Sequence, residues 1–342
     1  MLTQYMADTD FLRFASRDES ALVLILDDLQ KHAGDRVIFG VSELLQGPGV
    51  MDLNSLTGNE ESPITYGDTL YIHELAHAIL LVGPISDQRI LFDRRKTGRS
   101  RLSDWYAART DHSGANQLAG YTPQTDTRFT GLQSTVATTR QVLPAGITDA
   151  ANLTSANTFD ITAIDTATNN AKAITSGIRA LRVGSRDFYI LFMHTSQATD
   201  MRKNTSLGQW LDIQKAAMTG GDIGDNPISW MALGMYRQTL IHENVRITNA
   251  VANAGTAVAN TKRALHMGAQ AAVLAFGRSQ NDSNKFRWLE ELRDFGRQIG
   301  IGVSAIWGLL KVNFNSTDFA VQCVDTYGLD LDTLGAAATN AQ

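Results

Sequence analysis

The residues with the clearest chemical potential are His73, Glu74 and His77, which spell the H-E-x-x-H signature of zinc proteases. On a helix, residues four positions apart lie on one face, so two imidazoles can hold one ion. The intervening glutamate then activates a metal-bound water. A catalytic zinc also needs a third protein ligand, so the residues after His77 decide whether the motif can work.

The usual sources of a third zinc ligand are missing from this sequence. The extended form of the motif requires glycine at position 80 and histidine at position 83, where this chain has Leu80 and Gly83. The other common solution uses a glutamate a few tens of residues downstream, and the next glutamate after the motif is Glu243. Asp87 and Asp93 remain as candidate ligands, although no pattern marks either of them.

The segment around the motif favours a β-strand instead. Side chains alternate between the two faces of a strand, so His73, Leu75 and His77 would share one face with Tyr71, and Glu74 would lie on the other. In that geometry the glutamate could not serve a metal held by the histidines. Residues 69–72 are β-prone, and residues 65–68 read as a turn. We predict a strand over residues 69–82 and keep the zinc metalloprotease as an alternative.

Composition indicates a folded, mildly acidic protein. The chain has 342 residues, of which 43% are hydrophobic and 19% charged, and its formal net charge is −5, so it lacks a global basic signature for nucleic acid. It contains no apolar run of 18 residues, and its amino terminus lacks the pattern of a secretion signal. The single cysteine, Cys323, excludes an intramolecular disulfide framework and is typical of a reducing cytoplasm.

The first third of the chain predicts a helix followed by a long ribbon. Ser16 and Glu19 form a capping box, and apolar residues at helical spacing continue to His32. A short strand at residues 36–40 precedes a stretch to residue 68 that is rich in turn formers. Together with the strand at 69–82, this makes a two-stranded ribbon that buries too little apolar area to be stable alone. We expect it to lie on another surface, and a neighbouring subunit is one candidate.

A long, strongly basic helix is predicted after the ribbon, from Ser86 to about Leu118, with Ser86 and Asp87 as its caps. Such a helix usually has a solvated face or meets acidic neighbours. An acidic loop such as Glu60 and Glu61 of another copy would fit that role. The basic residues of this helix are Arg89, Arg94, Arg95, Lys96, Arg99 and Arg101.

The remainder of the chain predicts a mixed α+β region. Residues 121–160 form a long irregular connection, and a helix is expected over residues 160–176. The apolar run 188–194 is typical of a strand covered on both faces, a helical segment follows it, and further strands are expected in 228–247, 264–276 and the last third.

Three other sequence features do not support catalysis. Gly220 and Gly221 lack the lysine and helix context of a phosphate-binding loop. His194 and the pair His242 and Glu243 have no serine elbow or cysteine nucleophile with them. We interpret these histidines as structural polar positions.

Short segments spread along the chain carry a family resemblance. They are Leu56–Glu61, His77–Ala78, Asp104–Trp105, Asn226–Ile228, Ile241–Glu243, Arg263–Leu265, Gly268–Ala272, Phe286–Glu291, Phe314–Phe319 and Val324–Thr326. In this order they resemble the major capsid proteins of tailed double-stranded DNA phages, in the branch typified by short-tailed phages with a very large virion RNA polymerase. The resemblance covers most of residues 35–327, and residues 121–160 match poorly.

The resemblance implies the α+β fold of HK97-like capsid proteins. Residues 1–34 would be an N-terminal arm and residues 35–84 the extended loop, which has no metal site in the family. Residues 85–185 would form the peripheral domain with its long spine helix, and residues 186–300 the axial domain. Residues 301–342 would return to the peripheral domain and end in a tail.

The implied function is that of a major capsid protein, which assembles with itself into hexamers and pentamers of an icosahedral shell around double-stranded DNA. Scaffolding, portal and decoration proteins would be its partners, with assembly in the host cytoplasm, incorporation into the virion and no membrane involved. The resemblance implies no catalytic residue, cofactor or metal, and an encapsulin-like cage is a further alternative. The candidate interface residues are Gly58, Asn59, Glu60, Glu61, Arg94, Arg95 and Arg99.

Overall fold

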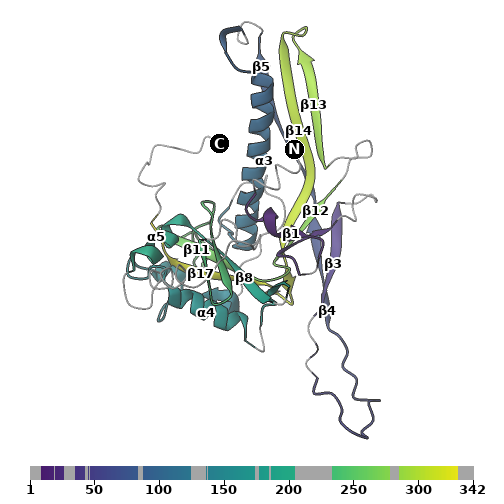
Figure 1. Cartoon of the computed structure of the whole chain (residues 1–342), viewed down its shortest axis with the longest axis vertical. Coiled ribbons are helices and arrows are strands. Elements are labelled where there is room, and N and C mark those ends of the chain that lie inside the picture. The colour runs from purple at the N-terminus through teal and green to yellow at the C-terminus, as the bar shows by residue number, and fades with distance from the viewer. Residues whose placement is uncertain are drawn as a thin grey trace.

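Two β-sheets and one long helix form the framework of the protein (Figure 1). The structure is a computed structural model, and it describes residues 9–18, 20–26, 35–42, 45, 47–83, 88–124, 136, 138–173, 177–184, 186–204, 233–277 and 285–329. The long helix, α3 (Arg94–Leu118), runs beside the first sheet and ends between the two sheets. No helix in these ranges is both long and apolar enough to cross a membrane.

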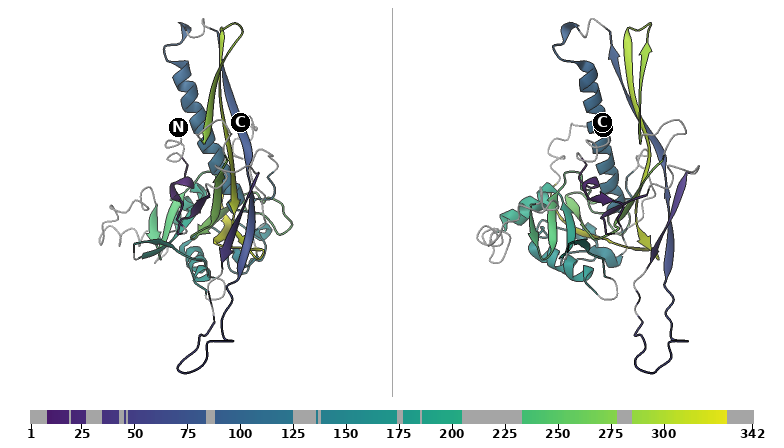
Figure 2. Two further views of the ribbon diagram at one scale, coloured as in Figure 1. Left: turned by 90° about the vertical axis from the view of Figure 1, so that its right-hand side faces the viewer. Right: turned by 45° about the vertical axis from the view of Figure 1, so that its right-hand side comes forward.

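The first sheet follows α3 along most of its length. Its strand order is β1-β2-β12-β14-β13, and β5 pairs with β14 on the side opposite β13. Figure 2 shows β5, β13 and β14 rising together next to the helix. The bounds are β1 (Ala15–Ser16), β2 (Val23–Leu26), β5 (His73–Val82), β12 (Ala272–Phe276), β13 (Phe286–Arg293) and β14 (Gln298–Lys311).

Strand β14 supplies the apolar surface that holds α3. Its buried positions alternate through Ile301, Val303 and Ala305 to Trp307, as expected of a strand with one face on a core. The hydroxyl of Tyr106 on α3 lies within hydrogen-bond distance of the carbonyl oxygens of Leu75 and Val303, so one buried side chain joins the helix to two strands. This satisfies the polar end of an otherwise apolar contact.

The second sheet forms a more compact unit with α4 (Ile161–Ala171) and α5 (Thr195–Lys203). Its order is β6-β17-β11-β8-β10-β9, with β7 added to β8. The last six residues of β8 are all buried, which confirms the predicted strand covered on both faces. The bounds are β6 (Gln141–Val142), β7 (Leu181–Val183), β8 (Arg186–Met193), β9 (Gly234–Tyr236), β10 (Thr239–Glu243), β11 (Thr261–Met267) and β17 (Val321–Tyr327).

A separate ribbon, β3 (Arg36–Ser42) with β4 (Thr65–Tyr71), carries the most exposed part of the chain. At its base Val37, Phe39 and Val41 alternate inward and pack in one cluster with Leu310 of β14. Beyond the base, the loop that joins the two strands extends away from the rest of the protein (Figure 1). The small hairpin β15 (Asn313–Phe314) and β16 (Thr317–Asp318) lies near this base.

The predicted helix from Ser16 to His32 is wrong over its described part. Residues 15–16 and 23–26 are strands, and β2 pairs in parallel with β12, Val23 lying opposite Ala272. The Ser16 hydroxyl bonds to Asp18 within a local turn and does not cap a helix. These apolar residues form a strand despite their helical spacing, because pairing with β12 buries Val23 beside the buried Leu22 and partly buries Ile25 and Leu26. Glu19 and residues 27–34 lie outside the described residues.

The ribbon also differs from the prediction in its second strand. Residues 65–68, expected to form a turn, belong to β4, and the ribbon ends at Tyr71. The next strand, β5, leaves the ribbon and pairs with β14 over ten positions, from His73 opposite Trp307 to Val82 opposite Gln298. The strand at the H-E-x-x-H motif is therefore confirmed, and its predicted partner is corrected.

The long basic helix is confirmed, but it starts later than predicted. Asp93 is its N-cap, and its carboxylate accepts hydrogen bonds from the amides of Arg95 and Lys96 at 2.9 and 3.1 Å. Ser86 and Asp87 lie outside the described residues. The helix predicted over residues 160–176 is confirmed as α4, although it ends earlier, at Ala171, and it packs on β6 and β17. The predicted domain bounds at residues 34, 84, 185 and 300 stay predictions.

Two ion pairs are buried, and the first of them joins distant parts of the chain. Arg263 on β11 donates to both carboxylate oxygens of Asp325 on β17, each at 2.7 Å, and also to the carbonyl oxygens of Val251 and of Ala119 at the end of α3. Lys311 and Asp318 form the second pair, at 2.6 Å. Removing one partner of such a pair leaves an uncompensated buried charge.

We therefore expect Arg263→Met to lower the free energy of unfolding by about 3–5 kcal/mol, because Asp325 stays buried after its cation is lost. The matched control is Arg99→Met, which removes an exposed ion pair and is expected to cost less than about 1 kcal/mol. Urea denaturation of both purified chains measures the difference. Equal losses for the two variants would contradict this account of how α3 is fastened.

Candidate subunit interface

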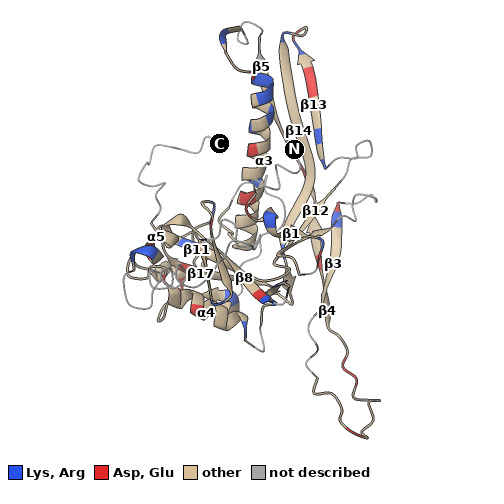
Figure 3. Ribbon diagram, viewed as in Figure 1, with Lys and Arg blue, Asp and Glu red and all other residues tan. Residues whose placement is uncertain are grey.

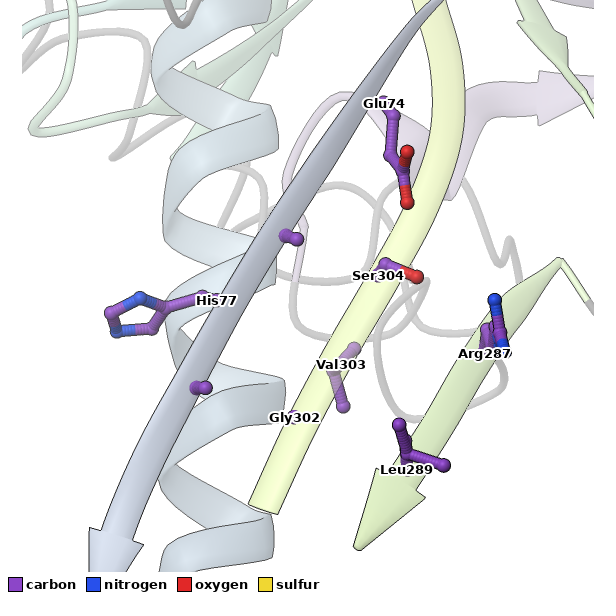
Figure 4. Close-up of a pocket in the computed structure, with 9 residues that line it drawn as sticks. Glu74, His77, Arg287, Leu289, Gly302, Val303 and Ser304 are labelled. Carbon is purple, nitrogen blue, oxygen red and sulfur yellow. The ribbon is translucent and has the colours of Figure 1, made fainter. Parts of the chain in front are cut away.

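The H-E-x-x-H residues are arranged as a strand requires. His73 and His77 lie on the same face of β5, but four residues of extended chain separate their Cα atoms by roughly 13 Å, too far to share an ion. Figure 4 shows the imidazole of His77 and the carboxylate of Glu74 on opposite sides of β5. The His77 ring stacks on Trp105 of α3, with ring centroids 4.3 Å apart.

The remaining candidate ligands do not complete a zinc site. Asp93 caps α3, and Asp87 lies outside the described residues. Within the part of the chain that the structure describes, no group of three or more histidine, cysteine, aspartate or glutamate side chains is placed to hold a metal ion. The geometry of β5 therefore gives the motif a packing role against α3.

The two other histidines that the sequence singled out also have structural surroundings. The Nδ1 atom of His194 accepts from the amide of Ser196 and caps α5. His242 is buried between the rings of Phe14 and Phe192, and burial lowers its pKa to about 4. Gly220 and Gly221 lie outside the described residues.

The four predicted interface residues of the ribbon lie together in one exposed turn. Gly58 has a φ of +90°, a conformation that favours glycine, and its amide donates to the Glu60 carboxylate at 2.6 Å. The Asn59 side chain donates to the carbonyl oxygen of Ser55, and Glu61 accepts from the amide of Gly47 across the loop. The loop is thus held in shape by its own polar contacts.

Large apolar side chains accompany these polar residues. Leu53 is fully exposed, at 103%, and four further apolar residues of the loop are more than half exposed: Leu45, Met51, Leu56 and Ile64. Exposed leucines occur singly on most proteins, but a group on one extended loop marks an interaction site.

The predicted basic residues of α3 lie at the other end of the molecule. Arg95 and Arg99 both donate hydrogen bonds to the carboxylate of Glu290 on β13. These bonds, of which the one from Arg95 has the larger effect, lower the pKa of that carboxyl to about 2. Arg99 also lies over the ring of Trp288 at 5.1 Å. Arg94 is half-buried at the first position of the helix. Glu290 of the same chain therefore competes with the predicted acidic loop of another copy for these arginines.

Sequence reasoning missed Glu290, the carboxylate that Arg95 and Arg99 contact. It lies in a segment singled out only for its family resemblance, and β13 places it opposite Ile301 of β14, on the side that faces the first turns of α3. The alternation of aromatic and charged residues from Phe286 to Trp288 could have suggested a strand, but no local signal pairs a residue with another 195 positions away.

Charge is distributed unevenly between the two ends. Between Arg36 and Arg89 the sequence contains acidic residues and neither lysine nor arginine, whereas residues 89–101 are predominantly basic. In Figure 3 basic residues (blue) gather on the upper part of α3, and acidic residues (red) lie on the loop of the ribbon at the opposite end. Within one chain the two groups of predicted interface residues do not meet.

An open groove lies on the face of the first sheet that points away from α3. Its volume is about 350 Å³, and its floor is made of small residues between the charged side chains of Glu74 and Arg287 (Figure 4). The small residues are Ala76, Ala78, Gly302 and Ser304, with Leu289 at the side.

Comparison with known proteins decides what this architecture is. The model of the family described as phage capsid protein matches residues 2–329. The chain belongs to the phage capsid protein family. It is 25% identical to the major capsid protein of Pseudomonas phage KPP25, over 90% of this chain and 88% of that protein.

Solved capsid structures share the fold along nearly the whole chain. The capsid of Ralstonia phage GP4 superposes with a TM-score of 0.81 at 29% identity, covering 93% of this chain and 90% of that one. The capsid of cyanophage Pam1 gives 0.73 at 17% identity, covering 95% and 93%. These findings confirm the HK97-like fold. The protein is a major capsid protein that forms part of the multimeric shell of a bacteriophage virion.

We expect the purified protein to contain much less than one zinc per chain, because the strand geometry keeps His73 and His77 from binding one ion. Elemental analysis of wild-type protein and of His73→Ala measures this, and the two are expected to give the same value. One zinc per chain in the wild type, lost in the variant, would return the motif to a metal-binding role.

Proposed function

We propose that this capsid protein assembles through its ribbon loop into hexamers and pentamers, and that these build an icosahedral shell around double-stranded DNA. The observation that carries the proposal is the loop itself, residues 47–64, which is exposed almost throughout and displays apolar side chains. Burying a leucine stabilises a contact by roughly 1.5–3 kcal/mol, so covering this loop strongly favours association.

Opposite charges at opposite ends of one chain favour a head-to-tail contact between copies. The acidic loop of one copy would contact the basic first turns of α3 in the neighbouring copy, beside the ion pair of Arg95 and Glu290. Such a heterologous contact uses two different surfaces, and it closes into a ring when the rotation between copies permits. Each contact alone contributes a modest binding free energy, and closing the ring combines several such contacts into a stable assembly.

In the proposed interface, the groove on the first sheet would bind the apolar side chains of the neighbouring copy's loop. Its floor of small residues leaves room for side chains such as Leu53 and Leu56 of an incoming loop. Arg287 at its side carries the charge that matches Glu60 and Glu61. In this arrangement the four predicted interface residues of the loop would contact the three predicted arginines of α3 in the neighbouring copy.

The wider assignment follows from the family and from charge. A net charge of −5 suits a wall that contains DNA without adhering to it. We further propose scaffolding, portal and decoration proteins as partners, assembly in the host cytoplasm, and a purely structural role without catalytic residues. The division into arm, extended loop, peripheral domain and axial domain is part of this proposal.

Reversing the charge of the loop tests the contact. The double variant Glu60→Lys/Glu61→Lys is expected to fold but to yield at least about tenfold fewer shells or capsomers, since like charges across an interface cost several kcal/mol. Electron microscopy and light scattering of the purified protein measure the yield. Raising the salt concentration should weaken wild-type association in the same assay.

A compensating variant provides the control. Adding Arg94→Glu and Arg99→Glu to the double variant is expected to restore assembly, whereas these two changes alone should impair it. Glu60→Gln/Glu61→Gln, which removes charge without reversing it, should have an intermediate effect. Normal assembly of the charge-reversed loop, with circular dichroism unchanged, would exclude this interface.

A further inference from the structure

The carboxylate of Glu290 on β13 has all of its hydrogen-bond partners inside its own chain. Arg95 donates to it from Nε at 3.2 Å and also from Nη2, and Arg99 donates from Nη2 at 2.5 Å. Trp288, two positions earlier on the same strand, donates from its indole nitrogen at 3.2 Å. A carboxylate accepts about four hydrogen bonds, so the acceptor positions of Glu290 are filled.

The two arginines, in contrast, can still accept a partner from outside the chain. Their side chains are 53% and 51% exposed, whereas that of Glu290 is 20% exposed. A guanidinium has several N–H donors, and the contacts with Glu290 use only some of those on Arg95 and Arg99. A second carboxylate can therefore reach both arginines from the solvent side while Glu290 stays in place or is displaced.

We propose that Glu290 is an internal competitor for the acidic loop of a neighbouring copy, and that it keeps the contact between copies weak enough to be reversible. The inference rests on the proposed interface, in which Glu60 and Glu61 of one copy meet the first turns of α3 in the next. It adds a residue that limits the strength of that interface.

Glu290 opposes docking of the loop whichever way the loop binds. If a loop carboxylate displaces Glu290, the hydrogen bonds gained between copies replace those lost within the chain. If it joins Glu290 at the arginines, two like charges lie side by side and repel each other. Hydrogen bonds from Arg95, and then from Arg99, lower the pKa of Glu290 to about 2, so the competing charge is present throughout the neutral range.

Glu290 also orients the arginines, which acts in the opposite direction. Holding a long side chain in place before docking reduces the entropy cost of binding. Arg99 keeps a second support, because its guanidinium lies 5.1 Å from the centre of the Trp288 ring. Glu290→Gln keeps the length of the side chain and one oxygen acceptor, so it removes the competing charge and retains part of this orientation. We therefore expect the loss of charge to dominate.

A weakened contact suits a shell that is built from many copies. Differences in affinity between related interfaces arise mostly from the rate of dissociation. A copy that has docked wrongly through one such contact can leave again, whereas a copy held by several contacts at once stays. Competition by Glu290 would thus favour the closed, correctly placed assembly over isolated contacts.

We expect Glu290→Gln in the full-length protein to lower the concentration at which capsomers or shells form by at least about fivefold, because one unit charge at close range changes an association constant by about that factor even in water. Light scattering over a dilution series measures this concentration, and circular dichroism checks the fold. Added salt should weaken the assembly of Glu290→Gln more steeply than that of the wild type, since the arginines then lack a neutralising charge.

The matched control is Glu243→Gln, which removes the same charge from an exposed carboxylate on the second sheet, where Arg202 lies 3.9 Å away. It is expected to change the assembly concentration by less than about twofold, as is usual for an exposed ion pair. An assembly concentration of Glu290→Gln that equals or exceeds that of the wild type would overturn the proposal, and an excess would assign Glu290 to orienting the arginines.

The loop variant Glu60→Gln/Glu61→Gln separates this inference from the interface on which it rests. Without the loop carboxylates Glu290 has no competitor, so Glu290→Gln should then change the assembly concentration by less than about twofold. An equal gain on both loops would contradict the competition. If Glu60→Lys/Glu61→Lys assembles normally, the interface is wrong and the inference falls with it. If that variant fails to assemble and Glu290→Gln brings no gain, the interface stands and only the inference is wrong.

Discussion

The contact between α3 and β14 is the constraint on which the other contacts depend. A strand of fourteen residues buries one side on the helix through Ile301, Val303 and Trp307, and its two edges hold β5 and β13. Because β12 and then β2 extend the same sheet, the N-terminal segment also reaches the core through β14. The ribbon β3–β4 depends on it too, since its inward side chains pack on Leu310.

Helix α3 packs against both sheets, the second of them through its C-terminal turns. Its first turns are exposed and basic, whereas its last turns are buried among Phe192, Leu265 and Cys323 of the second sheet. Polar groups in that buried part must find partners, and Asp111 and the carbonyl oxygen of Ala119 find them in Arg246 and Arg263. The two sheets are therefore connected by specific polar contacts as well as by apolar packing.

Sequence reasoning was accurate where local pattern and final environment agree. The apolar run of β8, the helical spacing in α4 and the β-prone residues before the H-E-x-x-H motif are local signals that predicted their elements, and the family resemblance supplied the fold. The prediction failed at residues 16–26, because the leucines at helical spacing lie in a strand that pairs with β12, some 250 positions away. The partners of Arg95 and of Asp111 were unpredictable for the same reason. Each contact joins residues that only the folded chain brings together.

Strand β13 has a consequence for a protein that must exist in many copies at high local concentration. It forms the outer edge of the first sheet, where unpaired backbone amides and carbonyls invite pairing with another edge. Its exposed positions carry Arg287, Glu291 and Arg293 as well as Leu289 and Leu292, and Glu290 lies beside the arginines of α3. Charged side chains of both signs along an edge discourage backbone-to-backbone pairing out of register. These charges therefore disfavour edge-to-edge pairing of β13 between copies of the shell protein.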